Sequence, residues 1–589
     1  MRPGIDPGLR LAQRRLRLVG GLFTLAMLAL ALRLVDLALW RGEHAISGRA
    51  LASAMGSVRR ADIVDRNGTL LATDYPKTSL YADPSAVLDP AAAARRLADA
   101  LYGVDPAELA AKLAEPRRFV WLKRHITETE RRAVVRLGVP GVGFRSERHR
   151  VYPQRALTGH LVGYVGVENQ GLTGIERSFE SRLTAAETNQ TPLILTLDLG
   201  VQEVVRSELA AARARFDALG ASGIVLDVTT GELLASVSLP DFDPNHYQRA
   251  RPEARFNRNT LGTYELGSLF KVFTVAMALD AGAADIAGRF DATTPLQFGR
   301  YRISDFHAKR RWLSVPEVIA FSSNIGAAKM AQALGGESQL AYFERFGLLD
   351  RHPIRLPEVG LPQRPSTWRP INTVTAAYGH GLAVSPLQVA DGVAAAICSA
   401  PRPRAHLVAE ELPAVWERPP VSAETAAKLR WLMWLTVTEG TGKLAKVPGY
   451  LVGGKTGSAD KPGRGGGYRH GGLLASFVAA FPIDQPRYVV LIIFDEPKGD
   501  ADTYGQAHGG WTAAPTVGRI ISRIGPLLGL PPVDPGAELW FRERLIEGQA
   551  HNGWSGRVEP SFAVAPGVSW GDVTEGDAGC GCQPCSILG

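Results

Sequence analysis

Two residues in one short motif have the types and spacing needed for nucleophilic acyl transfer. The motif is Ser268-Leu-Phe-Lys271, which we expect at the start of a helix. At a spacing of i, i+3 the hydroxyl and the ammonium share one helix face. A serine hydroxyl is a weak nucleophile until a base takes its proton, and a partly buried lysine with a lowered pKa can be that base. Ser268 is therefore the candidate nucleophile and Lys271 its candidate base.

A second motif, Ser322-Ser-Asn324, offers groups that move protons and orient other groups. Ser322 can relay a proton to a leaving amine. The side-chain amide of Asn324 can hold a substrate carbonyl and orient Lys271, because it carries both an acceptor and donors. We therefore expect both residues beside the candidate nucleophile.

A third motif, Lys455-Thr-Gly-Ser458, suits the recognition of an anion. Lys455 supplies positive charge, and the hydroxyls of Thr456 and Ser458 can bind a terminal carboxylate. Gly457 lets an acyl chain lie beside the strand. An oxyanion hole needs two backbone N–H groups, for which Ser458 and the candidate nucleophile are the natural donors.

The order of the three motifs makes the pattern specific. S-x-x-K alone is weak, since it occurs a second time at Ser458–Lys461, just before Pro462. The other two motifs occur once each. A purely structural reading, in which Ser268 caps a helix and Asn324 turns a loop, accounts for one motif but not for all three.

The elements that must position these motifs follow from periodicity and turn residues. A β-hairpin is expected from two apolar runs around the turn at 229–232. The remaining expected elements are helices at 201–212, 264–281, 315–334 and 423–439, extended runs at 193–197, 476–481 and 488–494, a turn at 65–68, and a Pro-rich surface connection at 400–420.

The N-terminus predicts a membrane anchor. Residues 1–17 are rich in Arg, and an apolar run follows from Leu18 to Leu32. Extending the helix to Trp40 reaches the roughly 20 residues that cross a bilayer. The alternative is a signal peptide cleaved at Ala29-Leu30-Ala31. In either case the basic N-terminus is expected to be cytoplasmic and the bulk of the chain exported.

The composition argues against nucleic-acid binding, and the four cysteines are not expected to have a major functional role. The net charge of +8 is not concentrated in a basic block, so no nucleic-acid partner is expected. Cys398 ends an apolar run and is expected to behave as a core residue. Cys580, Cys582 and Cys585 supply three thiols with no nearby His, short of the four ligands of a structural zinc site. We predict no metal, no cofactor and an extended tail over 531–589.

With these motifs in this order, the sequence resembles the class B penicillin-binding proteins, in particular their division-specific, septal transpeptidases. The resemblance runs from the anchor to about residue 525 and includes the three motifs above. A departure is Leu266, where the family usually has Pro. Other segments that carry the resemblance are Asp65–Gly68, His160–Gly166, Gly171–Arg177, Tyr264-Glu265, Tyr378–Leu382, Ser385–Gln388, Glu439–Gly442 and Pro448–Tyr450.

The resemblance implies a fold and a domain order. It implies an α/β (α+β) penicillin-binding transpeptidase fold, with a central antiparallel sheet flanked by helices, on a mixed, β-rich pedestal domain with one transmembrane helix. The implied domains are a basic N-terminus at 1–17, an anchor at 18–40, a pedestal at 41–210, a transpeptidase domain at 211–530 and the tail at 531–589.

The resemblance also implies an activity and partners. Ser268 would attack a peptidoglycan stem peptide ending in D-Ala-D-Ala, the terminal D-Ala would leave, and the amine of a neighbouring stem would take the acyl group. β-Lactams would be inhibitors, and a polytopic glycan polymerase and other division proteins of the inner membrane would be partners. Two alternatives stay open at this point: a β-lactamase or D,D-carboxypeptidase that transfers the acyl group to water, and a β-lactam sensor or catalytically silent scaffold.

Overall fold

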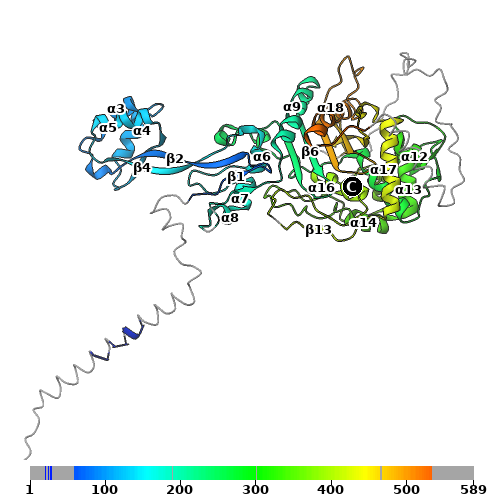
Figure 1. The fold of residues 1–589 in the computed structure, drawn as a ribbon, viewed down its shortest axis with the longest axis horizontal. Coiled ribbons are helices and arrows are strands. Elements are labelled where there is room, and N and C mark those ends of the chain that lie inside the picture. The colour runs from blue at the N-terminus through cyan, green and yellow to red at the C-terminus, as the bar shows by residue number, and fades with distance from the viewer. Residues whose placement is uncertain are drawn as a thin grey trace, which may run out of the picture. The chain divides into compact units, whose positions relative to one another are not determined.

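The computed structural model describes residues 59–533, apart from 187, 189, 300, 411 and 464–466, together with a few positions between 20 and 29. Within this range the chain forms two compact units, one made of 75–149 and the other of 60–74 and 150–533 (Figure 1). Most of the predicted anchor at 18–40 and all but the first residues of the predicted tail lie outside the described residues. No helix in the described part is long and apolar enough to cross a membrane.

The smaller unit packs three helices against strands. The helices are α3 (Pro90–Ala100), α4 (Pro106–Leu113) and α5 (Glu128–Leu137), and the strands include β3 (Val120–Ile126) and the greater part of β4 (Val142–Val151) (Figure 1). Each helix begins at a residue whose side chain accepts a backbone N–H: Asp89, Asp105 and Thr127. Such caps stabilise helix starts by about 1 kcal/mol each. The buried core consists of aliphatic side chains, among them Leu97, Leu109 and Leu122.

In the larger unit, the segment that begins at Arg60 is held in place by buried ion pairs. Arg60 donates to Glu176 on α7 (Gly174–Ser178), and Arg150 donates to the same carboxylate at 2.6 Å. The short strand β1 (Ile63–Val64) pairs antiparallel with β2 (Leu70–Ala82) and parallel with β5 (Leu193–Ile194). The predicted turn at 65–68 is confirmed, because Asp65 accepts the backbone N–H groups of the residues that follow it.

The three motifs of the sequence analysis belong to a body built on a five-stranded antiparallel sheet. The strands run in the order β14 (Gly453–Pro462), β15 (Tyr468–Phe481), β16 (Tyr488–Asp495), β6 (Gly220–Asp227) and β7 (Leu233–Leu239). The β6–β7 hairpin and the two late strands agree with the expected elements. A central antiparallel sheet of this kind was expected from the family resemblance.

Helices cover both faces of this sheet (Figure 1). On one face α9 (Leu199–Arg215) and α18 (Ala513–Leu527) pack on alternate apolar residues such as Val225 and Val490. On the other, α11 (Lys271–Asp280), α16 (Pro386–Ile397) and α17 (Ala423–Thr438) pack on the intervening residues, such as Ile224 and Leu491. Burial on both faces explains why the strands read as nearly continuous apolar runs.

Some expected elements differ from the structure. The helix predicted at 315–334 is two helices, α12 (Val315–Ala320) and α13 (Asn324–Leu334), because Ser322 adopts a left-handed φ of 60° between them. The Pro-rich segment at 400–420 is not only a surface connection. Arg402 and Leu407 are buried, and Arg402 donates to the carboxylate of Asp391 on α16 at 2.8 Å.

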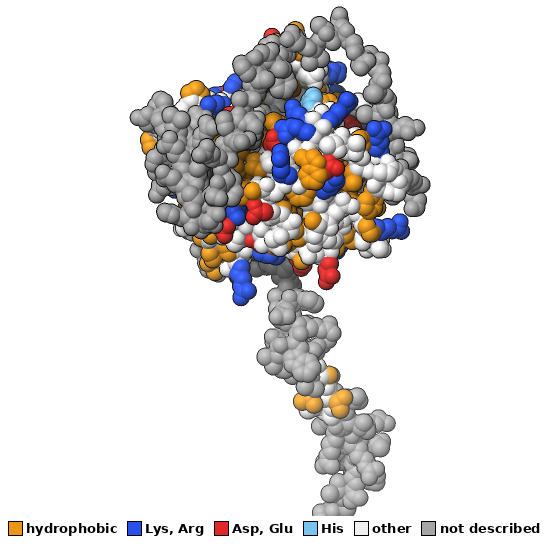
Figure 2. Space-filling model, turned by 90° about the vertical axis from the view of Figure 1, so that its right-hand side faces the viewer, with side chains coloured by type: hydrophobic (Ala, Val, Ile, Leu, Met, Phe, Trp, Pro, Cys, Tyr) orange, Lys and Arg blue, Asp and Glu red, His pale blue; other side chains and the backbone are white. Residues whose placement is uncertain are grey.

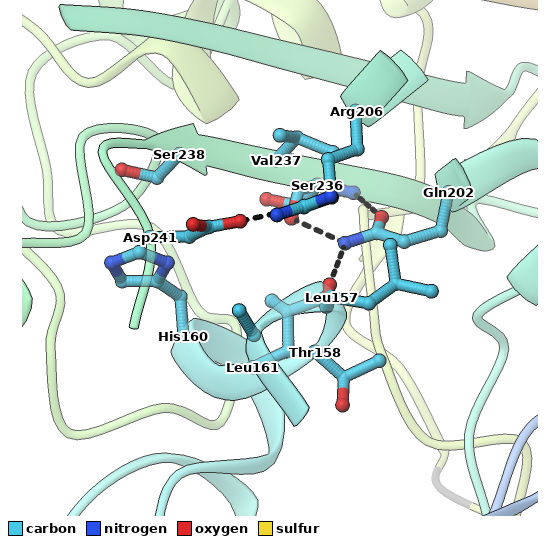
Figure 3. Close-up of a pocket in the computed structure, with 11 residues that line it drawn as sticks. Leu157, Thr158, His160, Leu161, Gln202, Arg206, Ser236, Val237, Ser238 and Asp241 are labelled. Carbon is cyan, nitrogen blue, oxygen red and sulfur yellow. Dashed lines mark hydrogen bonds and ion pairs between the residues drawn. The ribbon is translucent and has the colours of Figure 1, made fainter. Parts of the chain in front are cut away.

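The segment 156–161 packs against α9 and β7, and side chains from all three surround a small cavity (Figure 3). Gln202 donates to the backbone carbonyls of Leu157 and Ser236. These residues surround a cavity of about 10 Å³, which has room for one water molecule. The buried hydroxyl of Thr158, which lines the cavity, has no partner within the protein. A cavity of this size is too small for a peptide substrate.

The outer surface agrees with the basic composition. On the face drawn in Figure 2, Lys and Arg side chains are more prominent than Asp and Glu side chains, in line with the net charge of +8. Hydrophobic side chains lie between the charged ones on this face.

Candidate active site

The first motif lies where a tight turn enters a buried helix. Ser268 belongs to the single 3-10 turn η5 (Gly267–Phe270), and Lys271 is the first residue of α11. The predicted helical segment thus becomes helical only from Gly267 onward. This glycine has a φ of 54°, and an added Cβ would lie 2.6 Å from the carbonyl oxygen of Ser458. The turn therefore packs directly against strand β14.

Lys271 is fully buried and is surrounded by oxygen atoms. Its Nζ lies 2.8 Å from Oγ of Ser268, 2.7 Å from the carbonyl oxygen of Ser322 and 2.6 Å from Oδ1 of Asn324. Burial lowers the pKa of Lys271 to about 7. A substantial fraction of this side chain is therefore neutral at neutral pH, the state in which an amine can accept a proton.

The neighbours of Lys271 decide how a neutral amine is oriented. A neutral amine has two N–H donors and one lone pair. The carbonyl oxygen of Ser322 and Oδ1 of Asn324 can only accept, so they take the two N–H groups. The assignment of Oδ1 is supported by the amide nitrogen of Asn324, which donates to the carbonyl of Ser304 at 3.0 Å. The lone pair is left for a hydroxyl, and Oγ of Ser268 at 2.8 Å lies nearer to it than Oγ of Ser322 at 3.1 Å.

Ser322 connects the two lysines of the site. Its Oγ lies 3.1 Å from Nζ of Lys271 and 2.9 Å from Nζ of Lys455. The left-handed backbone of Ser322 costs energy for a residue with a Cβ. That conformation separates α12 from α13, and both the carbonyl and the hydroxyl of Ser322 lie within hydrogen-bond distance of Lys271.

Lys455 is the second fully buried lysine. Burial, together with the positive charge of Lys271, holds the pKa of Lys455 well below its usual range. Besides Ser322, its Nζ contacts the carbonyl and the hydroxyl of Thr456. No carboxylate among the described residues pairs with either lysine within 4 Å. Bringing a carboxylate to Lys455 would raise its pKa, and the resulting charge would disfavour a second proton on Lys271.

The remaining residues of the third motif lie on β14 beside the nucleophile. Thr456 shares a hydrogen bond of 2.7 Å with the hydroxyl of Thr441, and Ser458 accepts the backbone N–H of Gly509 at 3.2 Å. At Gly457 an added Cβ would lie 2.2 Å from Oγ of Ser476 and 2.8 Å from a backbone carbonyl. Only glycine fits here without a shift, so the small residue has a packing reason as well as the proposed substrate reason.

Three residues that the motifs did not identify support the site. Asp305 accepts from Ser323 at 2.7 Å and from the backbone of Ile325, and its carboxylate raises the pKa of Lys271 against the effect of burial. Thr441 shares a hydrogen bond with the hydroxyl of Thr456 in the third motif. Glu265 accepts from the backbone of Gly381 and from Tyr468, at 2.9 Å each.

A sequence signal existed for two of these three residues. Glu265 and Thr441 belong to segments that carry the family resemblance, although neither had been given a role. Asp305 lies in a loop with no recognisable motif. The structure therefore brings Ser268, Lys271, Ser322, Asn324 and Lys455 into one hydrogen-bonded cluster, with Thr456, Gly457 and Ser458 on the adjacent strand.

This geometry defines a class of site: a serine hydroxyl paired with a buried, partly neutral lysine, as in acyl transfer through a serine ester. Among the described residues, no cluster of three or more His, Cys, Asp or Glu side chains could hold a metal ion.

Comparisons with known proteins agree with this class. Residues 221–522 match the family model of the penicillin-binding protein transpeptidase domain, and residues 56–191 match that of the penicillin-binding protein dimerisation domain. The chain is 38% identical over 504 residues to the probable peptidoglycan D,D-transpeptidase FtsI of Caulobacter vibrioides, covering 83% of this chain and 85% of that protein. It is 31% identical over 521 residues to the probable peptidoglycan D,D-transpeptidase PenA of Neisseria meningitidis, covering 81% and 86%.

A solved structure shares the fold. The crystal structure of penicillin-binding protein 3 from Mycobacterium tuberculosis, complexed with aztreonam, superposes with a TM-score of 0.65 at 22% identity, covering 82% of this chain and 98% of that one. The chain belongs to the class B penicillin-binding proteins, which combine the dimerisation and transpeptidase domains.

Proposed function

We propose that this chain is a peptidoglycan D,D-transpeptidase that cross-links stem peptides at the division septum through an acyl-enzyme on Ser268, and that β-lactams inhibit it by acylating the same serine. The family membership and the similarity to FtsI support the activity. The observation that carries the assignment of residues is the contact of 2.8 Å between Nζ of Lys271 and Oγ of Ser268.

In the first half-reaction Ser268 Oγ attacks the carbonyl carbon of the penultimate D-Ala, and its proton passes to Nζ of Lys271. The backbone N–H groups of Ser268 and Ser458 are proposed to stabilise the oxyanion. The C–N bond then breaks. The proton reaches the leaving D-Ala amine through the hydroxyl of Ser322, which lies 3.1 Å from Nζ of Lys271.

In the second half-reaction the amine of a neighbouring stem attacks the ester carbonyl. Lys271 takes a proton from this amine, the C–O bond breaks, and Ser268 Oγ recovers a proton. The new amide bond is the cross-link. The same base serves both halves because it returns to its neutral state after each one.

Substrate binding prepares the base. The terminal carboxylate of the donor peptide is proposed to bind Thr456 and Ser458 beside Lys455. Its negative charge raises the pKa of Lys455, which then takes up a proton. The charge on Lys455, with Ser322 between the two amines, keeps Lys271 neutral. Recognition of the carboxylate thus favours the reactive state of the nucleophile–base pair.

The domain order and topology complete the proposal. Residues 18–40 form the single membrane anchor, with 1–17 in the cytoplasm, a pedestal at 41–210 and a periplasmic transpeptidase domain at 211–530. A polytopic glycan polymerase and other division proteins are the proposed partners. Protease added to spheroplasts should degrade the bulk of the chain, whereas a soluble periplasmic form lacking residues 1–31 would favour cleavage of a signal peptide.

Labelled penicillin tests the function against its alternatives. A transpeptidase should become labelled and release the label slowly, because its acyl-enzyme is built to react with an amine and not with water. Fast release would instead favour a β-lactamase or carboxypeptidase. The absence of labelling would favour a silent scaffold.

A further inference from the structure

A basic loop at the edge of the active site has no role in the reaction described above. We name residues 305–311, Asp305-Phe-His-Ala-Lys-Arg-Arg311, the rim loop. It connects β10 (Tyr301–Ile303) to β11 (Trp312–Ser314). Its first residue accepts hydrogen bonds from Ser323 and Ile325. The rim loop therefore starts on the wall of the site that carries the second motif.

The rim loop also reaches the opposite wall. The ring of Phe306 is 72% exposed, and its centroid lies 4.7 Å from that of His508 in an edge-to-face contact. The next residue after His508 is Gly509, whose backbone N–H donates to Ser458. The loop thus contacts both the segment with Ser323 and the segment beside the proposed carboxylate site.

The positive charge of the rim loop is only partly neutralised. Nζ of Lys309 lies 4.8 Å from the ring centroid of Phe321, the residue immediately before Ser322. A cation–π contact restrains an ammonium without cancelling its charge. Arg311 pairs with Glu317 at 2.6 Å. Among the described residues no carboxylate lies within ion-pair distance of Lys309 or Arg310.

The unpaired charges distinguish this loop from an ordinary solvated surface. A solvated lysine usually extends into water, whereas Lys309 is held over an aromatic ring next to a residue of the active site. Arg310 has a left-handed φ of 52°, a strained conformation at an exposed position. These features place a restrained positive charge beside the second motif, where an anionic part of a bound ligand would meet it.

We infer that the rim loop recognises a second carboxylate of the peptide substrate, upstream of the terminal carboxylate, with Lys309 as its main contact and Arg310 as an adjacent positive charge. This inference rests on the proposed function, since it concerns the peptide that acylates Ser268. The recognised chemistry is an acidic residue in the donor peptide. An amide at that position would lack the charge and would bind the loop less well.

The test uses matched pairs of synthetic peptides ending in D-Ala-D-Ala. In each pair one Glu, or Gln in its place, is set at one of the three positions before the terminal dipeptide. The rate of acylation per unit of peptide concentration is measured for the full chain in detergent, at low and at physiological salt. At one position at least, this rate for the wild type should be about three- to tenfold higher with the Glu peptide than with the Gln peptide. The difference should be smaller at higher salt, because salt screens a partly exposed ion pair.

Three variants make the test specific. Lys309→Gln should remove the preference for Glu, and Lys309→Arg should largely retain it because the charge remains. Arg418→Gln removes one charge from another exposed position, has no ion pair with a described residue, and should behave as the wild type. Absence of any preference in the wild type, or an unchanged preference in Lys309→Gln, would overturn the inference.

Penicillin separates this inference from the proposed function. Acylation by penicillin depends on Ser268 and should be similar in the wild type and the three variants. If the proposed function were wrong, penicillin would either acylate none of the four proteins or be released fast from all of them. If only the inference were wrong, penicillin would acylate all of them while the peptide preference stayed independent of Lys309.

Discussion

Nζ of Lys271 lies 2.8 Å from Oγ of Ser268, nearer than the 3.1 Å to Oγ of Ser322, and two oxygens that cannot donate accept its N–H groups. The arrangement fits a neutral amine whose lone pair faces the serine hydroxyl. Burial, which lowers the pKa of Lys271 to about 7, makes that neutral form accessible. Each of the following predictions depends on this relationship or on the framework around it.

Lys271→Arg should abolish acylation. A guanidinium stays protonated and cannot take the serine proton, so the rate of penicillin acylation should fall by about 10²- to 10⁴-fold, the contribution of a general base. The variant should fold normally, as judged by circular dichroism, and should still bind ligand weakly. Acylation near the wild-type rate would mean that Lys271 is only an electrostatic partner, with Lys455 the next candidate base.

The acylation rate should rise with pH through about 7. The neutral form of Lys271 is the reactive one, so activity is low below the pKa of about 7 and reaches a plateau above it. The carboxylate of Asp305 raises this pKa. Asp305→Asn should therefore move the midpoint of the pH–rate profile to lower pH. A profile without a midpoint near neutrality, or an upward shift in Asp305→Asn, would contradict this account.

Loss of either hydroxyl of the third motif should slow acylation. A charge-assisted hydrogen bond is worth roughly 1.5–3 kcal/mol, so Thr456→Val or Ser458→Ala should lower the rate by about ten- to a hundredfold if the hydroxyl binds the carboxylate in the transition state. In the Val variant Thr441 also loses its partner. Wild-type rates in both variants would place the carboxylate elsewhere.

A buried charge network should contribute strongly to the stability of the face of the sheet that α16 covers. Asp391 is fully buried and accepts from Arg402 at 2.8 Å and from Arg404 at 2.7 Å, with His352 at 3.1 Å. Asp391→Ala would leave buried cations unpaired, at a cost of about 3–5 kcal/mol.

Thermal unfolding of the same protein measures this cost. The melting temperature should fall clearly in Asp391→Ala and remain nearly unchanged in Glu424→Gln, which removes an exposed ion pair with Lys428. Equal falls in melting temperature in the two variants would show that the buried network contributes no more to stability than an exposed ion pair.

Local sequence patterns predicted the elements but not every contact of the site. Apolar runs and turn residues located the β6–β7 hairpin, and α17 lies within one residue of its expected bounds. The break at Ser322 was missed because apolar residues resume directly after Ser322-Ser-Asn324 at a helical spacing, and local sequence does not show the contacts of Ser322 with the two lysines that help to offset its backbone strain. Asp305 was missed because it reaches the site from a loop, and no spacing rule relates it to the motifs.

The buried segment at 400–420 was missed for a similar reason. Its prolines favour a surface connection, but Arg402 and Arg404 are drawn inward by Asp391, which lies on α16. An apolar helix with one Asp does not reveal where that carboxylate finds its partners. Long-range ion pairs of this kind cannot be read from local composition.

The most direct test of the central claim is to locate the adduct after acylation by penicillin. Mass spectrometry of a peptic digest should find the penicilloyl group on the peptide that contains residues 264–271, and Ser268→Ala should remove it completely. Ser322→Ala should retain slow labelling, because Ser322 is proposed to relay a proton and not to attack. An adduct on any other serine, or labelling that persists in Ser268→Ala, would contradict the assignment of Ser268 as the nucleophile.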